Sequence, residues 1–490
     1  MNFNRFNTSE FMPVAPYCPS SSQDLQAVHQ FITTCLPQVA QSNPAQLVSI
    51  TLAVPTVDPL LVLAHLAHSP DVHFYVENAA TQTAAVALGS VLNYQIVGAD
   101  RFAQARRFID AWGCQTQHYQ APEVPIVALG RTSLPRFFCS FTFFAQGSHG
   151  CIGFPGATVV LPQWQLLRQG NRCTLTLNVR LTPSTAPAAV LSDLETCIQA
   201  IDRLSQQQWP SPLPLRPQPI EPTAQAESQF KAAVATALGH IARHKLQKIV
   251  LAHAFDWVRT EPFQPLPSLG QLRQRYPDCY VFSVGNGQGQ RFMGASPERL
   301  LSVRQGNLIT DALAGSAPRG YSPHADRQLA LQLLRSPKEQ GEHRLVVEFL
   351  AQKLMDLGLH PTYPKAPTLR RLSNIQHLHT PIQARLSVDT HPLQLVEALH
   401  PTPAVAGVPT YDACEQIHRF ESFDRGLYAA PLGWIGANGD SEFIVGIRSA
   451  LIDHNWARLY AGAGIVAGSN PTREWAEIQL KFRALGEALL

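Results

Sequence analysis

A proline-rich stretch near the middle of the chain limits how the polypeptide can fold. Residues 209–222 have the sequence WPSPLPLRPQPIEP, with six prolines in fourteen positions. Because proline lacks a backbone N–H and has a fixed φ, this stretch can be neither a helix nor a central strand. We interpret it as a semi-rigid connector, which predicts a boundary between residues 1–208 and residues 223–490.

The bulk properties are those of an ordinary globular protein, and they exclude several function classes. Of the 490 residues, 45% are hydrophobic and 15% are charged, which allows an ample core. The net charge is only +3 and there are no basic runs, so we expect no nucleic-acid partner. We expect no membrane span and no secretory signal, because no apolar run has the necessary length or flanks. The nine cysteines are scattered singly, which indicates reduced thiols in the cytoplasm.

Residues 1–208 have the pattern of a mixed α/β region. We predict helices over residues 24–36, 84–90 and 101–112. Apolar runs and apolar–polar alternation predict strands over residues 46–55, 72–77, 136–144, 157–169 and 173–181. No catalytic spacing occurs in this region, and we expect its isolated histidines to be core or surface residues: His29, His65, His68, His118 and His149.

Beyond the connector, predicted strands and helices surround a number of polar residues. An amphipathic stripe predicts a helix over residues 227–245. Apolar runs predict strands over residues 246–255, 279–285, 291–296, 299–304, 307–312, 431–437, 442–452 and 457–464. Ser336, with Glu339 three residues later, is a capping-box start for a helix that extends to about Asp356.

The stretch YAGAGIVAGSNPTREWAEIQLK, residues 460–481, places glycine-rich backbone next to charged side chains. Asn470 can cap a helix, on which Glu474, Glu477 and Lys481 would share one face. A solvated, salt-bridged surface would have the same spacing. The glycines of YAGAG, however, bring free backbone N–H groups close to the same place. Together these features favour a site for a metal-bound anion.

Two polar residues occupy positions where a core is expected. Lys248 opens the apolar run KIVLA and by alternation shares a face with Val250 and Ala252. It either reaches water at the end of the strand or points inward, where a desolvated amine can serve as a neutral base. Glu298 follows a strand and a Ser-Pro turn in GASPERL, and by position alone it could equally be a turn carboxylate at a solvent edge.

Two pairs of carboxylates suggest a magnesium site. Glu339 and Glu342 lie one turn apart on a predicted helix, as do Glu474 and Glu477. If the two helices meet, the four side chains form an all-oxygen site, which suits Mg²⁺ better than zinc or a redox metal. The Gly/Ala loops LAGSAPRG and YAGAG lack the spacing of nucleotide-binding motifs, so nucleotide binding is not supported.

Eight motifs occur in an order that resembles the chorismate-utilising enzymes. They are GASPERL, LAGSAPRG, KEQGEH, NIQHL, LHPTPAVAGVPT, RGLYAAPLGW, VGIRSA and YAGAGIVAGSNPTREWAEIQLK. The resemblance covers residues 225–490 densely and the first half weakly, through residues 73–78 and 85–90, and it points to isochorismate synthases of the menaquinone or phylloquinone type. It implies one α/β (α+β) fold of two layered, largely antiparallel sheets flanked by helices. On that view the proline connector joins two halves of one fold.

The resemblance also implies a reaction on chorismate as the small-molecule substrate. Water adds at C2 of the ring, the double bond shifts and the C4 hydroxyl leaves, so the site needs one proton acceptor and one donor. Lys248 would be the general base that activates water, and Glu298 would be the general acid.

The remaining implied roles fall into a metal set and a substrate set. Glu342 and Glu477 would bind Mg²⁺ directly, and Glu339 and Glu474 would act mainly through its waters. The residues that would hold the acidic groups or line the ring of the substrate are Gly315, His377, Ala404, Val405, Tyr428, Arg448, Gly462, Gly464 and Lys481.

Particular positions distinguish the branches of this family. Anthranilate synthases resemble one another in carrying Gln at the position of Lys248. A lysine at this position favours water over ammonia as the nucleophile. Ala314 replaces the nucleophilic Lys of aminodeoxychorismate synthases, and Ala404 replaces the Thr of other branches. His253, where Arg is usual, and Ala430, where Gly is common, are departures that bear on packing and rate. We expect a monomer without a glutaminase partner; the alternatives are a salicylate synthase and a non-catalytic chorismate-binding subunit.

Overall fold

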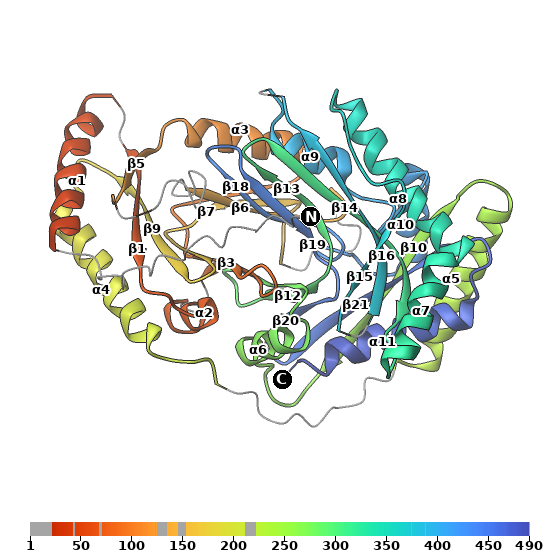
Figure 1. Ribbon diagram of the computed structural model, residues 1–490. Coiled ribbons are helices and arrows are strands. Elements are labelled where there is room, and N and C mark those ends of the chain that lie inside the picture. Colours follow the sequence, from red (N-terminus) through yellow and green to blue (C-terminus); the bar gives the residue numbers. More distant parts are fainter. Residues whose placement is uncertain are drawn as a thin grey trace, which may run out of the picture.

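Two large β-sheets stack face to face, and helices surround them (Figure 1). Aromatic rings meet between the sheets: the ring centroids of Phe74 from one sheet and Phe138 from the other lie 5.6 Å apart. The predicted α+β fold with two layered sheets is therefore confirmed. The computed structural model describes residues 22–42, 45–67, 71–122, 124, 135–145, 153–210, 222–373, 375–387 and 389–489.

The larger sheet has twelve strands. In spatial order they are β17 (Gly407–Val408), β10 (Lys248–Val258), β21 (Trp456–Val466), β20 (Ser449–Asp453), β12 (Arg291–Ser296), β11 (Tyr280–Asn286), β2 (Val72–Asn78), β3 (Thr83–Leu88), β8 (Trp164–Gln169), β9 (Arg172–Leu181), β1 (Gln46–Val54) and β5 (Gln117–Gln120). Neighbouring strands are antiparallel except for β1 and β5, which are parallel.

The smaller sheet has nine strands, and its neighbours pair antiparallel. In spatial order they are β15 (Thr368–Arg371), β16 (Ile375–Arg385), β14 (Asn307–Pro318), β13 (Arg299–Arg304), β19 (Ser441–Val445), β18 (Pro431–Gly436), β6 (Arg136–Phe141), β7 (Ala157–Leu161) and β4 (Leu92–Ile96).

The described residues form eleven helices, which cover the two ends and the outer faces of the sheets (Figure 1). They are α1 (Ser22–Ser42), α2 (Pro59–Leu66), α3 (Arg101–Gly113), α4 (Pro187–Ser205), α5 (Ala224–Ala242), α6 (Pro265–Arg275), α7 (Pro323–Arg335), α8 (Pro337–Asp356), α9 (Pro392–Leu399), α10 (Thr410–Phe420) and α11 (Pro471–Gly486). Helices α5, α7, α8, α10 and α11 gather at one end, and α1 and α4 lie together at the other. None of these helices is long and apolar enough to cross a membrane.

The two sides of the proline connector contribute strands to both sheets. In the larger sheet β2 pairs with β11, so that Val76 lies opposite Phe282. In the smaller sheet β6 pairs with β18, so that Phe138 lies opposite Trp434. Backbone hydrogen bonds therefore join residues 1–208 to residues 223–490 in each layer. Most of the connector itself, like His68 and His149, lies outside the described residues.

Most predicted elements are present, but one predicted helix is a strand, and two predicted strands, over residues 157–169 and 442–452, are each two strands; the second of these is β19 and β20. Of residues 84–90, predicted as a helix, residues 84–88 lie in strand β3, which pairs with β2 and β8, and residues 89–90 follow the end of that strand. Residues 84–88 are all buried there, so sheet pairing and packing override the helix preference of alanine. The predicted strand over residues 157–169 is two strands, β7 and β8, and the break falls at Pro162, which cannot donate a backbone hydrogen bond.

Candidate active site

A cavity of about 130 Å³ lies where β10, β14 and β21 approach helices α8 and α11. Its lining includes Lys248, Glu298, Gly315, Glu342, His377, Ala404, Val405, Tyr428, Arg448, Gly462, Gly464, Glu477 and Lys481. Of the residues that the resemblance assigned, only Glu339 and Glu474 do not line it, and each stands three residues before a glutamate that does. We therefore take this cavity as the candidate active site.

Lys248 points into the protein rather than to water. It is the first residue of β10 and is held between β17 and β21, opposite Val408 and Val466. Its side chain is 1% exposed, and Nζ donates a hydrogen bond to Oε1 of Glu342 over 2.7 Å. The alternation of the KIVLA run therefore predicted the correct face, and the ammonium group is neutralised by one glutamate of helix α8.

Glu298 is buried at the junction of β12 and β13, not exposed at a turn. Its backbone N–H donates to Oγ of Ser296, and its carbonyl accepts from the N–H of Val445, so the backbone is fixed on both sides. Its carboxyl group accepts no hydrogen bond from the described residues. Burial raises the pKa of Glu298 to about 7, against the opposing effect of the Lys248 charge and with a further increase from Asp311. The carboxyl group can therefore hold a proton near neutral pH.

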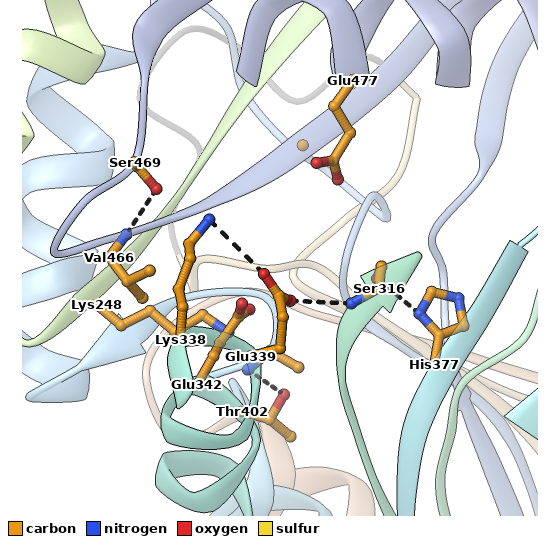
Figure 2. A network of polar contacts seen from close by, with 12 residues as sticks. Lys248, Ser316, Lys338, Glu339, Glu342, His377, Thr402, Val466, Ser469 and Glu477 are labelled. Carbon is orange, nitrogen blue, oxygen red and sulfur yellow. Dashed lines mark hydrogen bonds and ion pairs between the residues drawn. The ribbon is translucent and has the colours of Figure 1, made fainter. Parts of the chain in front are cut away.

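The four glutamates come from the first two turns of two helices. The Ser336 side chain accepts from the N–H of Glu339 and begins α8, and the Asn470 side chain accepts from two N–H groups and begins α11. Both cap signals were predicted from the sequence. Figure 2 shows Glu339 and Glu342 on one helix with Glu477 on the other, facing them across the site.

The charges of these carboxylates affect one another. Burial raises the pKa of Glu339, with further increases from Glu342 and Glu477. Burial likewise raises the pKa of Glu474, with further increases from Glu477 and Glu342. Burial also tends to raise the pKa of Glu477, but the adjacent Lys481 ammonium holds it below its usual value. The site therefore concentrates negative charge, which a cation would stabilise.

In the structure, lysines supply the counter-charges of these glutamates. Lys248 pairs with Glu342, and Lys481 Nζ lies 2.6 Å from Oε1 of Glu477. Lys338 Nζ lies 3.8 Å from Oε1 of Glu339, and Figure 2 includes this ion pair. Within the described part of the chain, no three His, Cys, Asp or Glu side chains are gathered closely enough to hold a metal ion. The donor set is nonetheless made of carboxylates, as Mg²⁺ prefers, so the site fits this metal in chemistry and would require rotation of the glutamate side chains.

A chain of hydrogen bonds joins Arg448 of the cavity to Glu339 of helix α8. Arg448, which has a φ of +50°, approaches Nε2 of His377 with Nη2 at 3.3 Å, and Nδ1 of His377 lies 2.8 Å from Oγ of Ser316. The backbone N–H of Ser316 donates to Oε2 of Glu339 over 3.1 Å. Burial and the Arg448 charge lower the pKa of His377 well below its usual value, so the ring is neutral. Since Nε2 accepts from Arg448, Nδ1 carries the proton that faces Ser316.

The glycines of YAGAG allow side chains from other elements to approach the backbone of β21. A Cβ atom on Gly464 would lie 2.9 Å from Oε1 of Glu342, and one on Gly462 would lie 2.7 Å from the hydroxyl of Tyr428. Lys481 Nζ also donates to the Gly462 carbonyl over 2.7 Å. The glycines thus make room for the acidic and phenolic groups of the site.

A buried ion pair holds two walls of the cavity in place. Arg425 and Glu421 are 0% and 3% exposed, and Arg425 donates to Glu421 and to the carbonyls of Val405 and Val250. Glu421 in turn accepts from the N–H of Ala252. Val405 and Val250 line the cavity, so this pair connects the loop that would contact the ring to the strand that begins at Lys248.

Sequence reasoning missed Ser316, Lys338 and the Arg425–Glu421 pair. Ser316 follows Gly315 in the LAGSAPRG motif, which was predicted as a loop but lies mostly in strand β14, and Lys338 precedes Glu339, so both were adjacent to predicted residues. For Arg425 the one signal was its place in the RGLYAAPLGW motif, because its partners are far apart in sequence. The departures His253 and Ala430 do not line the cavity; His253 packs against the rings of Trp475 and Phe482.

The fold consists of two layered sheets, and one cavity brings together the carboxyl group of Glu298, the buried Lys248 and glutamates from two helices. This combination is the one expected for an enzyme that acts on chorismate. Residues 30–490 match the family model described as "Chorismate binding enzyme". The chain belongs to the family of chorismate-binding enzymes.

Similar proteins are named isochorismate synthases. The chain is 33% identical to a "Salicylate biosynthesis isochorismate synthase" of Pseudomonas aeruginosa, over 96% of this chain and 95% of that protein. It is 38% identical to "Isochorismate synthase MenF" of Bacillus subtilis, over 52% of this chain and 54% of that protein. Among solved structures, the menaquinone-specific isochorismate synthase MenF of Escherichia coli is 28% identical, with a TM-score of 0.72, over 95% of this chain and 100% of that one.

Proposed function

We propose that this protein is an isochorismate synthase, an isomerase that converts chorismate to isochorismate. Two similar proteins support the assignment, because each is named for this activity and each matches almost the whole chain. The observation that carries the chemistry is that Lys248 and Glu298 line the same cavity, close enough for the lysine charge to affect the carboxyl group.

In the proposed reaction Lys248 removes a proton from water as the oxygen bonds to C2 of the ring. The electron pairs of both conjugated ring double bonds shift, from C1=C2 to C1=C6 and from C5=C6 to C4=C5, and the C4–O bond breaks. Glu298, protonated near neutral pH, gives its proton to the departing oxygen, which leaves as water. The atoms balance, because one water enters and one water leaves.

Lys248 can accept a proton only after it is released from Glu342. As the structure stands, the ammonium donates to that carboxylate over 2.7 Å, and an ammonium in an ion pair is not a base. Glu342 is one of the four glutamates that we assign to the metal set. When Glu342 turns to another partner, the Lys248 amine loses this hydrogen bond and becomes free to contact water.

We infer that Glu342 and Glu477 hold Mg²⁺ and that Glu339 and Glu474 contact its waters. The carboxylate donor set and the mutual effect of the charges of these glutamates support this assignment. When bound, Mg²⁺ would neutralise and orient a substrate carboxylate. Arg448, Tyr428, Lys481 and the backbone of the YAGAG strand would hold the acidic groups of the substrate, and His377, Gly315, Ala404 and Val405 would surround the ring.

Incubation of the purified protein with chorismate and Mg²⁺, followed by chromatography, tests the assignment, with EDTA as control. We expect a mixture of chorismate and isochorismate that forms only with the metal. Salicylate plus pyruvate would instead identify a salicylate synthase. Unchanged chorismate with metal present would contradict the assignment and favour a non-catalytic subunit.

The biological setting is also a proposal. We infer that the product enters menaquinone or phylloquinone synthesis, which the likeness to MenF of E. coli supports, and that the enzyme works as a cytoplasmic monomer. Rescue of a quinone-deficient strain, cell fractionation and analytical ultracentrifugation test these three points. We also propose that residues 1–208 and 223–490 are halves of one fold, because each half contributes strands to both sheets.

A further inference from the structure

A second cavity, of about 320 Å³, lies directly beside the candidate active site. Helix α6, helix α11 and the end of β14 enclose it. Its lining is mostly apolar and includes Leu272, Tyr276, Ile375, Leu480, Ala484 and Leu485. This size and lining are typical of a site for a small organic ligand, and nothing in the proposed reaction uses it.

The two cavities share one polar wall. Ser316, Arg448, Glu477 and Lys481 line both of them. Two of these four are cations, and Nη1 of Arg448 is buried without a hydrogen-bond partner among the described residues. Lys481, in contrast, is occupied by Glu477 and the Gly462 carbonyl. A ligand in the second cavity would therefore find its anion partner in the guanidinium of Arg448.

We propose that the second cavity is a regulatory subsite for aromatic carboxylates, which bind with the ring against the apolar lining and the carboxylate on Arg448. Such a ligand takes from chorismate an arginine that the active site needs, so it inhibits in competition with the substrate. The regulatory role of this subsite rests on the proposed function. The binding of aromatic carboxylates to the cavity does not depend on that function.

The chemistry of the proposed product favours this class of ligand. Isochorismate is a cyclohexadiene carboxylate, and elimination of its enolpyruvyl group as pyruvate leaves an aromatic hydroxybenzoate. Compounds made further along from this product are therefore flat aromatic carboxylates, less polar than chorismate. They match an apolar cavity whose wall includes an arginine with one unpartnered nitrogen, Nη1 of Arg448, among the described residues.

Calorimetric titration of the metal-free protein with 2-naphthoate, without chorismate, tests the binding. We expect a sub-millimolar Kd, and binding of 2-naphthol at least ten times weaker because it lacks the carboxylate. Leu480 lies at the mouth of the cavity and is 57% exposed, so Leu480→Glu should keep the fold and raise the Kd at least tenfold. Leu331→Glu, at an exposed leucine of α7 that does not line this cavity, is the matched control and should leave the Kd unchanged.

A second variant, Ala476→Trp, blocks the same cavity by bulk rather than charge and should also raise the Kd. Equal affinity for naphthol and naphthoate, equal affinity in both Leu480→Glu and the control, or no binding at millimolar ligand would each overturn the proposal. Since the titration involves no turnover, its failure leaves the isochorismate assignment intact. An enzyme inactive on chorismate could in turn still bind naphthoate.

Discussion

At the scale of single residues, Glu298 and Lys248 differ in how the protein controls their protons. Glu298 is buried without a hydrogen-bond partner for its carboxyl group among the described residues, and burial keeps it protonated up to about pH 7. Lys248 is equally buried but has a carboxylate at 2.7 Å. One group is thus ready to donate, and the other must first lose its partner before it can accept.

The pKa of Glu298 predicts the pH dependence of the reaction. Because that pKa is raised to about 7 and the protonated form is the acid, kcat/KM should fall as the pH rises through about 7. Glu298→Gln cannot donate a proton, so turnover should drop roughly 10²- to 10⁴-fold and this alkaline decline should disappear. A pH–rate profile of both proteins checks this, with Glu348→Gln, at an exposed position of α8, as control. If the Glu298→Gln variant keeps the same decline at the same pH, the decline belongs to another group.

Lys248→Arg separates the ion pair from the base. Arginine can still pair with Glu342 and keep the fold, but it stays protonated and cannot take a proton from water. We expect a normal melting temperature and a loss of turnover of roughly 10²- to 10⁴-fold. Circular dichroism and the chorismate assay measure the two effects, and Lys353→Arg near the end of α8 is the matched control. Near wild-type turnover of Lys248→Arg would exclude the lysine as base.

At the scale of elements, the capped starts of α8 and α11 were predictable and the meeting of these helices was not. Ser336 and Asn470 are local signals, so the sequence placed Glu339 and Glu474 in first turns correctly. That the two helices face each other depends on β10, β14 and β21, which are far apart in sequence. The pairing of residues 84–88 with β2 and β8 likewise could not be predicted from a short alanine-rich segment.

The ion pair of Arg425 and Glu421 should matter more to the fold than an exposed pair would. Arg425→Met leaves Glu421 buried without its partner, which costs about 3–5 kcal/mol of unfolding free energy. The double variant Glu421→Leu with Arg425→Met buries no unpaired charge, so it should recover most of that loss. Urea denaturation measures both. A double variant as unstable as the single one would mean that the hydrogen bonds to Val250 and Val405, not the charge, hold the loop.

At the scale of the whole molecule, the resemblance predicted one fold where composition alone predicted a boundary. The proline-rich stretch is a real break in local pattern, but local pattern does not report which strands pair across it. The registers of β2 with β11 and of β6 with β18 show that both layers are shared. The second cavity was also beyond prediction, since its lining comes from α6, α11 and the end of β14.

Because the two parts share both sheets, neither should fold alone. A fragment of residues 223–490 would expose the edges of β11 and β18 and should be insoluble or lack cooperative unfolding. Co-expression with residues 1–208 should restore a soluble, active complex. Size-exclusion chromatography and the chorismate assay test this, and a soluble, active fragment of residues 223–490 would contradict it.

The strand order has a consequence for synthesis on the ribosome. Strand β10, which begins with Lys248, is flanked by β17 and by β21, and β21 ends only at Val466 of a 490-residue chain. About two hundred further residues must therefore be translated after Lys248 before β21 is complete. A product terminated before residue 456 lacks both β21 and α11, so it has neither Lys481 nor Glu477 of the site. The site can therefore form only after translation has passed β21 and α11.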